Sequence, residues 1–243
     1  MIDIVIPTYN RFESAQKLAK SLSDYNRYIK KIIIVDSSDN FEKTKSTSLI
    51  NHVYSSYKNQ PYQRFLGANL CSSKIVLFLD DDMTLINDSI FKDLKKIFKD
   101  QETVAVNLKF NNKNRFLSNI PKSAIKKKKN TVSIIGLLSG YPIAKQNSYL
   151  FCGIRGHRVS NRDIEFLSGG AFACRLKPMY ENFNFQLFDI YEKKLGKGED
   201  GITGYKLSKS GRVWAAEKSY FLHNDHENSV YTDSYYNFSK RVM

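Results

Sequence analysis

Three consecutive aspartates, Asp80, Asp81 and Asp82, directly follow the apolar run IVLFL at residues 75–79. Carboxylates this close repel one another and raise each other's pKa unless a positive group lies between them. A hard divalent cation takes oxygen ligands, usually one or two carboxylates together with substrate phosphates. Because alternate side chains of an extended chain point the same way, we expect Asp80 and Asp82 to hold one metal ion and one substrate group together. A solvated acidic turn is the alternative interpretation.

The elements that must position these aspartates alternate between strand and helix over the first part of the chain. Buried strands alternating with helices predict an α/β fold whose parallel sheet is covered on both faces. The segments with strand patterns are 2–9, 30–36, 74–79 and 103–110, those with helical patterns are 13–25 and 87–100, and 44–57 is expected to be helical in part.

Ligands of such sheets bind beyond the carboxyl ends of the strands. Three strand ends of this chain carry polar groups, at residues 7–11, 36–39 and 80–82. Because the carboxyl ends of parallel strands meet at one edge, we expect these groups to form a single nucleotide- and metal-binding site.

The second half of the chain has a weaker pattern from about residue 111 to 163. Order returns at EFLSGGAFACRL, predicted to be a strand that contains two glycines, and a helix-compatible stretch begins at Phe185. The loop GKGEDG, a short helix and a strand ending near FLHNDHEN follow. We see no linker or repeat and predict one domain, 1–243, with a regular first half (1–110), an elaborated second half (111–230) and a tail (231–243) that suggests a truncated chain.

The composition is that of a globular protein with an unusual charge. Of the 243 residues, 42% are hydrophobic, and 38 Lys and Arg against 24 Asp and Glu give a net charge of +14. Such an excess favours polyanionic partners, whether nucleotide phosphates, nucleic acid or an anionic membrane.

The cysteines and the apolar segments indicate where the protein acts. Cys71, Cys152 and Cys174 are odd in number and lack metal-ligand spacing, which favours free thiols in a reducing compartment. The chain opens with a strand instead of a signal peptide, and its longest other apolar stretch is too short to span a bilayer. We predict a cytoplasmic protein.

Five segments, DIVIPTYNR, IIIVDSSD, QRFLGANLCSSKIVLFLDDD, FLSGGAFACR and GEDG, occur in this order. Together they resemble glycosyltransferase family 2, closely over residues 2–110 and more loosely over 165–226. The resemblance implies an α/β GT-A fold, with a Rossmann-like nucleotide-binding half, a mixed central sheet and an elaborated acceptor-binding half. It also implies transfer of a sugar from a nucleotide-diphosphate sugar, a UDP-sugar by default, to an acceptor hydroxyl, with inversion and a Mn²⁺ or Mg²⁺ ion.

The resemblance assigns donor-binding roles to residues at the strand ends. Asp80 and Asp82 match the family's Asp-X-Asp motif and are implied metal ligands, and Asp36 is implied to accept a hydrogen bond from the base. Tyr9 either stacks on the base or packs within its loop. Arg64 contacts a phosphate, holds Asp36 or Asp80, or forms a structural ion pair. The implied nucleotide- and donor-binding residues are Pro7, Thr8, Tyr9, Arg11, Asp36, Ser38, Arg64, Gly67, Asp80 and Asp81.

The second half carries the implied catalytic groups. Asp200 matches the family's catalytic base, which deprotonates the acceptor hydroxyl, and Glu199 matches its neighbouring acid, which binds acceptor or sugar hydroxyls. The acid that the family often has two positions after the base is Ile202 here.

Two further features complete the implied site. Gly169 and Gly170 lie where the family places a glycine pair between donor sugar and acceptor, although a bulge in an edge strand would also explain them. A metal-binding histidine is implied near FLHNDHEN, with His223 favoured over His226.

The expected partners are a nucleotide-diphosphate sugar and a glycan, lipid-linked or phosphorylated acceptor. The basic run Lys126, Lys127, Lys128 and Lys129 is either a solvated loop or a contact with an anionic membrane at its inner face. A basic nucleic-acid-binding module would not explain three acidic strand ends, so no nucleic acid is expected. A catalytically inactive nucleotide-sugar binder differs only in turnover, and a nucleotidyltransferase would usually have a glycine-rich loop after the first strand, where PTYNRFES has no glycine.

Overall fold

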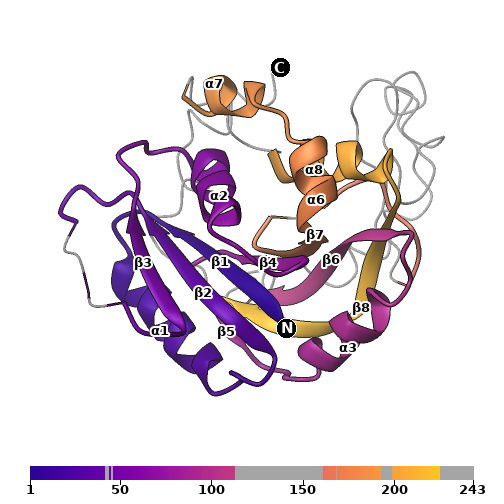
Figure 1. Cartoon of the computed structure of the whole chain (residues 1–243), viewed down its shortest axis with the longest axis horizontal. Helices are drawn as coiled ribbons and strands as arrows, with labels where there is room; N and C mark the ends of the chain where they lie inside the picture. The colour runs from indigo at the N-terminus through magenta and orange to yellow at the C-terminus, as the bar shows by residue number, and fades with distance from the viewer. Residues whose placement is uncertain (42–43, 45, 113–160, 168, 193–198, 225–243) are drawn as a thin grey trace, which may run out of the picture.

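The computed structural model describes residues 1–41, 44, 46–112, 161–167, 169–192 and 199–224. Within these residues, eight strands form one sheet in the order β3-β2-β1-β4-β7-β6-β8-β5 (Figure 1). The strands are β1 (Ile2–Thr8), β2 (Ile29–Asp36), β3 (Ile50–Tyr54), β4 (Ile75–Leu79), β5 (Met83–Leu85), β6 (Thr103–Asn112), β7 (Ala171–Arg175) and β8 (Arg212–His223). The helices are α1 (Phe12–Ser23), α2 (Gln60–Asn69), α3 (Ile90–Ile97), α6 (Leu176–Glu181), α7 (Gln186–Glu192) and α8 (Glu199–Ser208).

The sheet is mixed, as the family resemblance implied. The strands β3, β2, β1 and β4 are mutually parallel, whereas β7 runs antiparallel to both of its neighbours, β4 and β6. β8 is parallel to β6 and antiparallel to the short β5. Because β7 and β8 join the strands of the first half, the described parts of both predicted halves share one sheet.

Helices cover both faces of this sheet, and alternate side chains of the strands supply two cores. Ile4 and Ile6 of β1 pack into the core that includes α1 and α3, whereas Val5 packs into the core beneath α2, α6 and α8. Figure 1 shows α1 and α3 on one side of the sheet and α2, α6 and α8 on the other. The site residues therefore lie on a sheet that is fixed from both sides.

The helical structure predicted for part of residues 44–57 is wrong. Ile50–Tyr54 form β3, which pairs in parallel with β2 so that Ile50 lies opposite Ile32. Short apolar segments do not distinguish a helix from a strand by periodicity alone, and here pairing with β2 decides the structure.

Two other local predictions are corrected around the implied catalytic residues. Gly169 and Gly170 precede β7 instead of lying within it, and β7 is an interior strand, so the edge-strand bulge is wrong. Glu199 and Asp200 form the first turn of α8 instead of ending a loop.

Several residues named from the sequence lie outside the described residues. They are Lys126, Lys127, Lys128, Lys129, Cys152, His226 and the tail 231–243. Among the helices that the structure describes, none has the length and apolar character needed to cross a bilayer.

Candidate active site

The acidic run begins where β4 ends and forms a turn. The Met83 N–H donates to the Asp80 carbonyl (3.3 Å), and the Asp80 N–H donates to the Gly170 carbonyl (2.8 Å). The alternation expected of an extended chain therefore does not occur. Asp81 and Asp82 share Arg11, whereas Asp80 contacts Arg64.

Arg11 is one of the positive groups that the run of aspartates requires. This N-cap residue of α1 places its Nη2 2.7 Å from Asp81 Oδ1 and its Nη1 3.3 Å from Asp82 Oδ2. Thr8 Oγ1 donates to the other Asp81 oxygen at 2.6 Å. Burial nevertheless raises the pKa of Asp81 to about 7, because it outweighs the stabilisation of the carboxylate by Arg11 and Thr8.

Asp82 also contacts His223, the last residue of β8. His223 Nε2 lies 3.3 Å from Asp82 Oδ1, and the two side chains are 20% and 10% exposed. Asn224 fixes this end of the turn, because its backbone N–H and its Nδ2 both donate to the Asp82 carbonyl at 2.9 Å. β8 thus brings an imidazole, predicted from the sequence, directly to the acidic turn.

This donor set fits a divalent cation in part. Asp82 and His223 offer a carboxylate oxygen and an imidazole nitrogen, and such ions commonly take their other ligands from substrate phosphates and water. Within the described ranges, no group of three or more His, Cys, Asp or Glu side chains is arranged to hold a metal.

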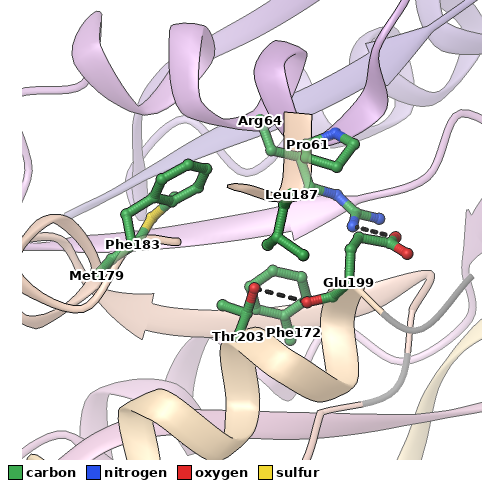
Figure 2. Close-up of a pocket in the computed structure, with 8 residues that line it drawn as sticks. All are labelled: Pro61, Arg64, Phe172, Met179, Phe183, Leu187, Glu199 and Thr203. Atoms are coloured by element: carbon green, nitrogen blue, oxygen red, sulfur yellow. Dashed lines mark hydrogen bonds and ion pairs between the residues drawn. The ribbon is translucent and has the colours of Figure 1, made fainter. Parts of the chain in front are cut away.

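Arg64 is the second positive group, on the other side of the turn. Its Nη1 donates to Glu199 Oε1 at 3.0 Å (Figure 2). Its Nη2 donates to Asp80 Oδ1 at 2.9 Å, and 7% of the side chain is exposed. Burial opposes the charge, but the carboxylates of Asp80, Glu199 and Asp200 together raise the pKa of Arg64. Gln60 Nε2 also donates to Asp80 Oδ1 at 3.0 Å. Of the predicted alternatives, Arg64 holds Asp80 and does not contact Asp36.

Glu199 and Asp200 are adjacent in the first turn of α8. Burial raises the pKa of Glu199 to about 7, with a smaller contribution from Asp200, while Arg64 opposes the shift. A methyl group at Gly169 would lie 3.2 Å from Asp200 Oδ2, so this carboxylate lies against the glycine turn. Gly170 has φ +93°, a conformation that glycine adopts without strain. Of the two glycines predicted to be near the reacting groups, Gly169 lies beside the predicted base, and Gly170 lies against Met83 and Phe110.

A small pocket lies beside the Arg64–Glu199 ion pair (Figure 2). Its walls are mainly apolar, and the attraction between two charges is stronger in such surroundings than in water. The lining residues are Pro61, Arg64, Phe172, Met179, Phe183, Leu187, Glu199 and Thr203.

Asp36, the predicted base-binding residue, is buried at the end of β2 and engaged with its surroundings. Its Oδ1 accepts hydrogen bonds from the Ser38 N–H (2.8 Å) and from the Ser38 hydroxyl (2.5 Å), and its Oδ2 lies 3.2 Å from His52 Nε2. The His52 ring stacks on Phe12 with centroids 4.1 Å apart. Thr44 N–H donates to His52 Nδ1 (3.3 Å), which leaves the ring proton on Nε2 to point at Asp36.

His52 is a residue that the sequence prediction missed. It lies in β3, in the segment expected to be partly helical, and β3 pairs Ile34 with His52. The sequence signal for it was weak: His52 is a polar residue in the short segment INHVY, which forms a strand only because it pairs with β2.

Tyr9 lies in an exposed group beside the same strand ends. It is 45% exposed, its hydroxyl donates to Asp39 Oδ2 (2.9 Å), and the Lys58 ammonium lies 5.4 Å from its ring centroid. Lys58 also donates to Asp39, and hydrogen bonds from Lys58, Asn10 and Tyr9 lower the pKa of Asp39 to about 2. The tyrosine ring is therefore both packed in its loop and open to solvent.

Two predicted donor-binding residues serve packing in this structure. Pro7 lies in β1 opposite Val35, and Gly67 is a buried residue of α2 on the side that packs against the sheet. A methyl group at Gly67 would lie 2.4 Å from Val5 Cγ1, so the close approach of α2 to β1 requires glycine here.

Solved structures share this architecture. S. aureus TarS 1–349 matches with a TM-score of 0.55 at 15% identity over 92% of this chain, and its complex with UDP-GlcNAc with 0.58 at 18% over 96%. The mannosyltransferase PcManGT from Pyrobaculum calidifontis, in complex with GDP-Man and Mn²⁺, matches with 0.59 at 12% over 94%. The chain spans about 60% of the TarS fragment and 58% of PcManGT. These structures are similar in fold, and the fold is GT-A.

The sequence itself matches the model of Glycosyl transferase family 2 over residues 3–181. The chain therefore belongs to this family, whose members are glycosyltransferase enzymes. A search of curated proteins found no significant match.

Proposed function

We propose that this protein transfers a sugar from a nucleotide-diphosphate sugar to an acceptor hydroxyl with inversion, with a UDP-sugar as the default donor. One observation carries the proposal: the Asp200 carboxylate, the glycine turn and the acidic turn converge at one edge of the sheet. The solved neighbours described with UDP-GlcNAc and with GDP-Man support a donor of this class.

Asp200 is the proposed base. It accepts the proton of the acceptor hydroxyl while that oxygen attacks the anomeric carbon from the face opposite the diphosphate. The new C–O bond forms as the bond from the anomeric carbon to the phosphate oxygen breaks, and that electron pair leaves with the nucleoside diphosphate. Gly169 leaves the space beside Asp200 in which an acceptor hydroxyl is deprotonated.

Asp82 and His223 are the proposed protein ligands of a Mn²⁺ or Mg²⁺ ion. When bound, such an ion neutralises the charge that develops on the departing diphosphate. Asp80 is the third predicted ligand, and its carboxylate is oriented by Arg64 and Gln60. Arg11 would position Asp81 and Asp82 beside this site.

The base and ribose would lie over the ends of β1 and β2. Asp36 and Ser38 supply hydrogen-bonding groups there, Thr8 and Tyr9 line the adjoining strand end, and the Tyr9 ring has an open face for stacking. We propose a glycan, lipid-linked or phosphorylated acceptor, with peripheral contact to an anionic membrane through Lys126–Lys129. Replacing the four lysines with glutamine should then weaken binding to phosphatidylglycerol vesicles.

A donor panel tests the function directly. The protein is incubated with UDP-GlcNAc, UDP-glucose, UDP-galactose and GDP-mannose, each with Mn²⁺ or Mg²⁺, and the released nucleoside diphosphate is measured with mixed glycans as acceptors. Turnover of one donor that Asp200→Asn abolishes supports the proposal. Binding of a donor without turnover under every condition would favour an inactive binder, and no binding would contradict nucleotide-sugar recognition.

A further inference from the structure

We propose that Arg64 is a positioning residue that holds the first turn of α8, and with it Asp200, against the end of β4. The inference rests on the proposed role of Asp200 and concerns how that carboxylate is kept in place. It assigns to Arg64 an effect on turnover instead of a contact with the donor phosphates.

The contacts of Arg64 connect the end of β4 with the start of α8, which are far apart in the sequence. One guanidinium nitrogen donates to Asp80, directly after β4, and another donates to Glu199, the first residue of α8. The side chain is 7% exposed, and its guanidinium lies 5.6 Å from the centroid of the Phe172 ring in β7. A planar guanidinium with donors on a rigid fork fixes both the distance and the orientation of its two partners.

The rest of α8 is held elsewhere, which leaves its first turn to Arg64. Gly204 packs directly on the backbone of Phe166 and Leu167, because a methyl group there would lie 2.2 Å from Leu167 N. The Thr203 hydroxyl donates to the Glu199 carbonyl at 2.7 Å, but this bond stays within the helix. Arg64 is the partner from outside α8 that binds the Glu199 side chain.

The same contacts connect Arg64, through Asp80 and the glycine turn, to the predicted base. Arg64 binds Asp80, the Asp80 N–H donates to the Gly170 carbonyl, and the neighbouring Gly169 lies against Asp200. A shift of either end of the ion pair therefore changes where Asp200 lies relative to the glycine turn. Misplacement of a reacting group by about 1 Å can cost on the order of 100-fold in rate.

The burial of Arg64 argues against a direct contact with phosphate. Both of its terminal nitrogens already donate to carboxylates in the protein. Because only 7% of the side chain is exposed, a phosphate has little access to the remaining N–H groups. Turning the guanidinium toward a phosphate would break its contacts with Asp80 and Glu199 and leave these carboxylates without their cation, which is strongly unfavourable.

The test compares Arg64→Gln, which removes the charge, with Arg64→Lys, which retains it. Arg175→Gln is the matched control, since among the described residues this partly buried arginine donates to the backbone carbonyls of Phe98, Asp100 and Thr103 and to no carboxylate. With the donor that the panel identifies, we expect Arg64→Gln to lower kcat by about 100-fold. Its Kd for UDP in the presence of Mn²⁺, measured by calorimetry, should rise far less than kcat falls, because of the proposed metal ligands only Asp80 contacts Arg64, while Asp82 and His223 keep their contacts. Arg64→Lys should recover part of kcat. Arg175→Gln should lower the melting temperature and leave kcat unchanged.

Hydrogen exchange gives a readout that needs no turnover. In Arg64→Gln the amides of residues 203–208 should exchange at least about ten-fold faster than in the wild type, because the helix opens more readily from its start. Glu199→Ala, which removes the carboxylate that accepts from Arg64, should give the same pattern if Arg64→Gln fails to fold.

Each outcome decides the proposal. A large loss of UDP affinity with unchanged kcat and unchanged exchange in α8 would make Arg64 a phosphate ligand and overturn the positioning role. If the wild type turns over no donor, the proposed function fails, whereas the exchange measurement still decides whether Arg64 holds α8.

Discussion

The two sides of the acidic turn neutralise their carboxylates in different ways. Asp81 and Asp82 face Arg11, whose side chain is 39% exposed, and Asp82 also contacts His223. Asp80 faces Arg64, whose side chain is 7% exposed and bound to a second carboxylate, Glu199. An exposed arginine can move away at small cost when a cation binds beside it, but a buried one cannot leave its partners. We infer that the Arg11 side is built to exchange ligands and the Arg64 side to hold a fixed geometry.

Asp200→Asn should give the largest effect, a loss of turnover. It should leave nucleotide binding on the Arg11 side of the acidic turn unchanged. Removing a general base costs about 100- to 10,000-fold in rate, because the acceptor hydroxyl then keeps its proton. UDP affinity with Mn²⁺ should stay within about two-fold, since Asp200 does not contact the Arg11 side. Steady-state kinetics and calorimetry measure the two effects, with the exposed Asp24→Asn as the control. An equal loss of binding would show that the two sides are not separate.

Gly204→Ala should disrupt the packing of α8 on the backbone of Phe166 and Leu167 without changing the contacts of Arg11 or Arg64. The new methyl group would lie 2.2 Å from Leu167 N and 2.6 Å from Phe166 C, so the helix must move off the backbone beneath it. Overpacking of this kind typically costs about 1–3 kcal/mol, and contact with backbone favours the upper end. Urea unfolding measures the loss, and Ile202→Ala, at an exposed position of the same helix, is the control. A variant as stable as the wild type would mean that α8 does not pack tightly on the backbone of residues 166–167.

Glu199→Gln should change how stability depends on pH. The pKa of Glu199 is raised to about 7 from an ordinary value of 4.5, so the native state binds the proton more tightly than the unfolded state. The contribution of this carboxyl group to the free energy of unfolding is therefore fully present below about pH 4.5, and it is lost as the pH rises to about 7. Relative to the wild type, the glutamine variant should gain up to about 3 kcal/mol of unfolding free energy between these limits.

Urea unfolding at several pH values in EDTA measures this difference. Asp81→Asn should show the same direction of change from the Arg11 side, because burial raises the pKa of Asp81 to about 7 as well. Parallel stability curves for Glu199→Gln and the wild type would contradict the raised pKa.

Tyr9→Phe should give the smallest effect, because it lies beyond both sides of the turn. The substitution keeps the ring and removes only the hydroxyl that donates to Asp39. UDP affinity should stay within about two-fold, whereas Tyr9→Ala should weaken it by about ten-fold if the base stacks on the ring. Equal affinity for all three proteins in a calorimetric titration would show that Tyr9 only packs its loop.

The parallel part of the fold was predictable because its strands are continuous apolar segments. Residues 2–9, 30–36 and 74–79 each give a strand whose polar end reaches the same edge. β3 was not predictable in the same way, since its burial depends on pairing with β2, and His52 was missed with it.

The residue spacing could not predict that Asp80 contacts Arg64 while Asp81 and Asp82 contact Arg11. The rule that alternate side chains point the same way holds for an extended chain, and residues 80–82 form a turn. The Arg64–Glu199 ion pair joins segments far apart in the sequence, so no local pattern reveals it. The order of the family's segments was the sequence signal that placed Glu199 and Asp200 near the strand ends.

The central claim is that the edge of the sheet at Asp82 binds a nucleoside diphosphate together with a metal ion. The most direct measurement is a calorimetric titration of UDP, dTDP, GDP and CDP into the wild type and Asp82→Asn, each with and without Mn²⁺. We predict that one nucleotide binds tightly, that binding requires Mn²⁺, and that Asp82→Asn abolishes it. Failure of all four to bind the wild type, or equal binding to Asp82→Asn, would contradict the account.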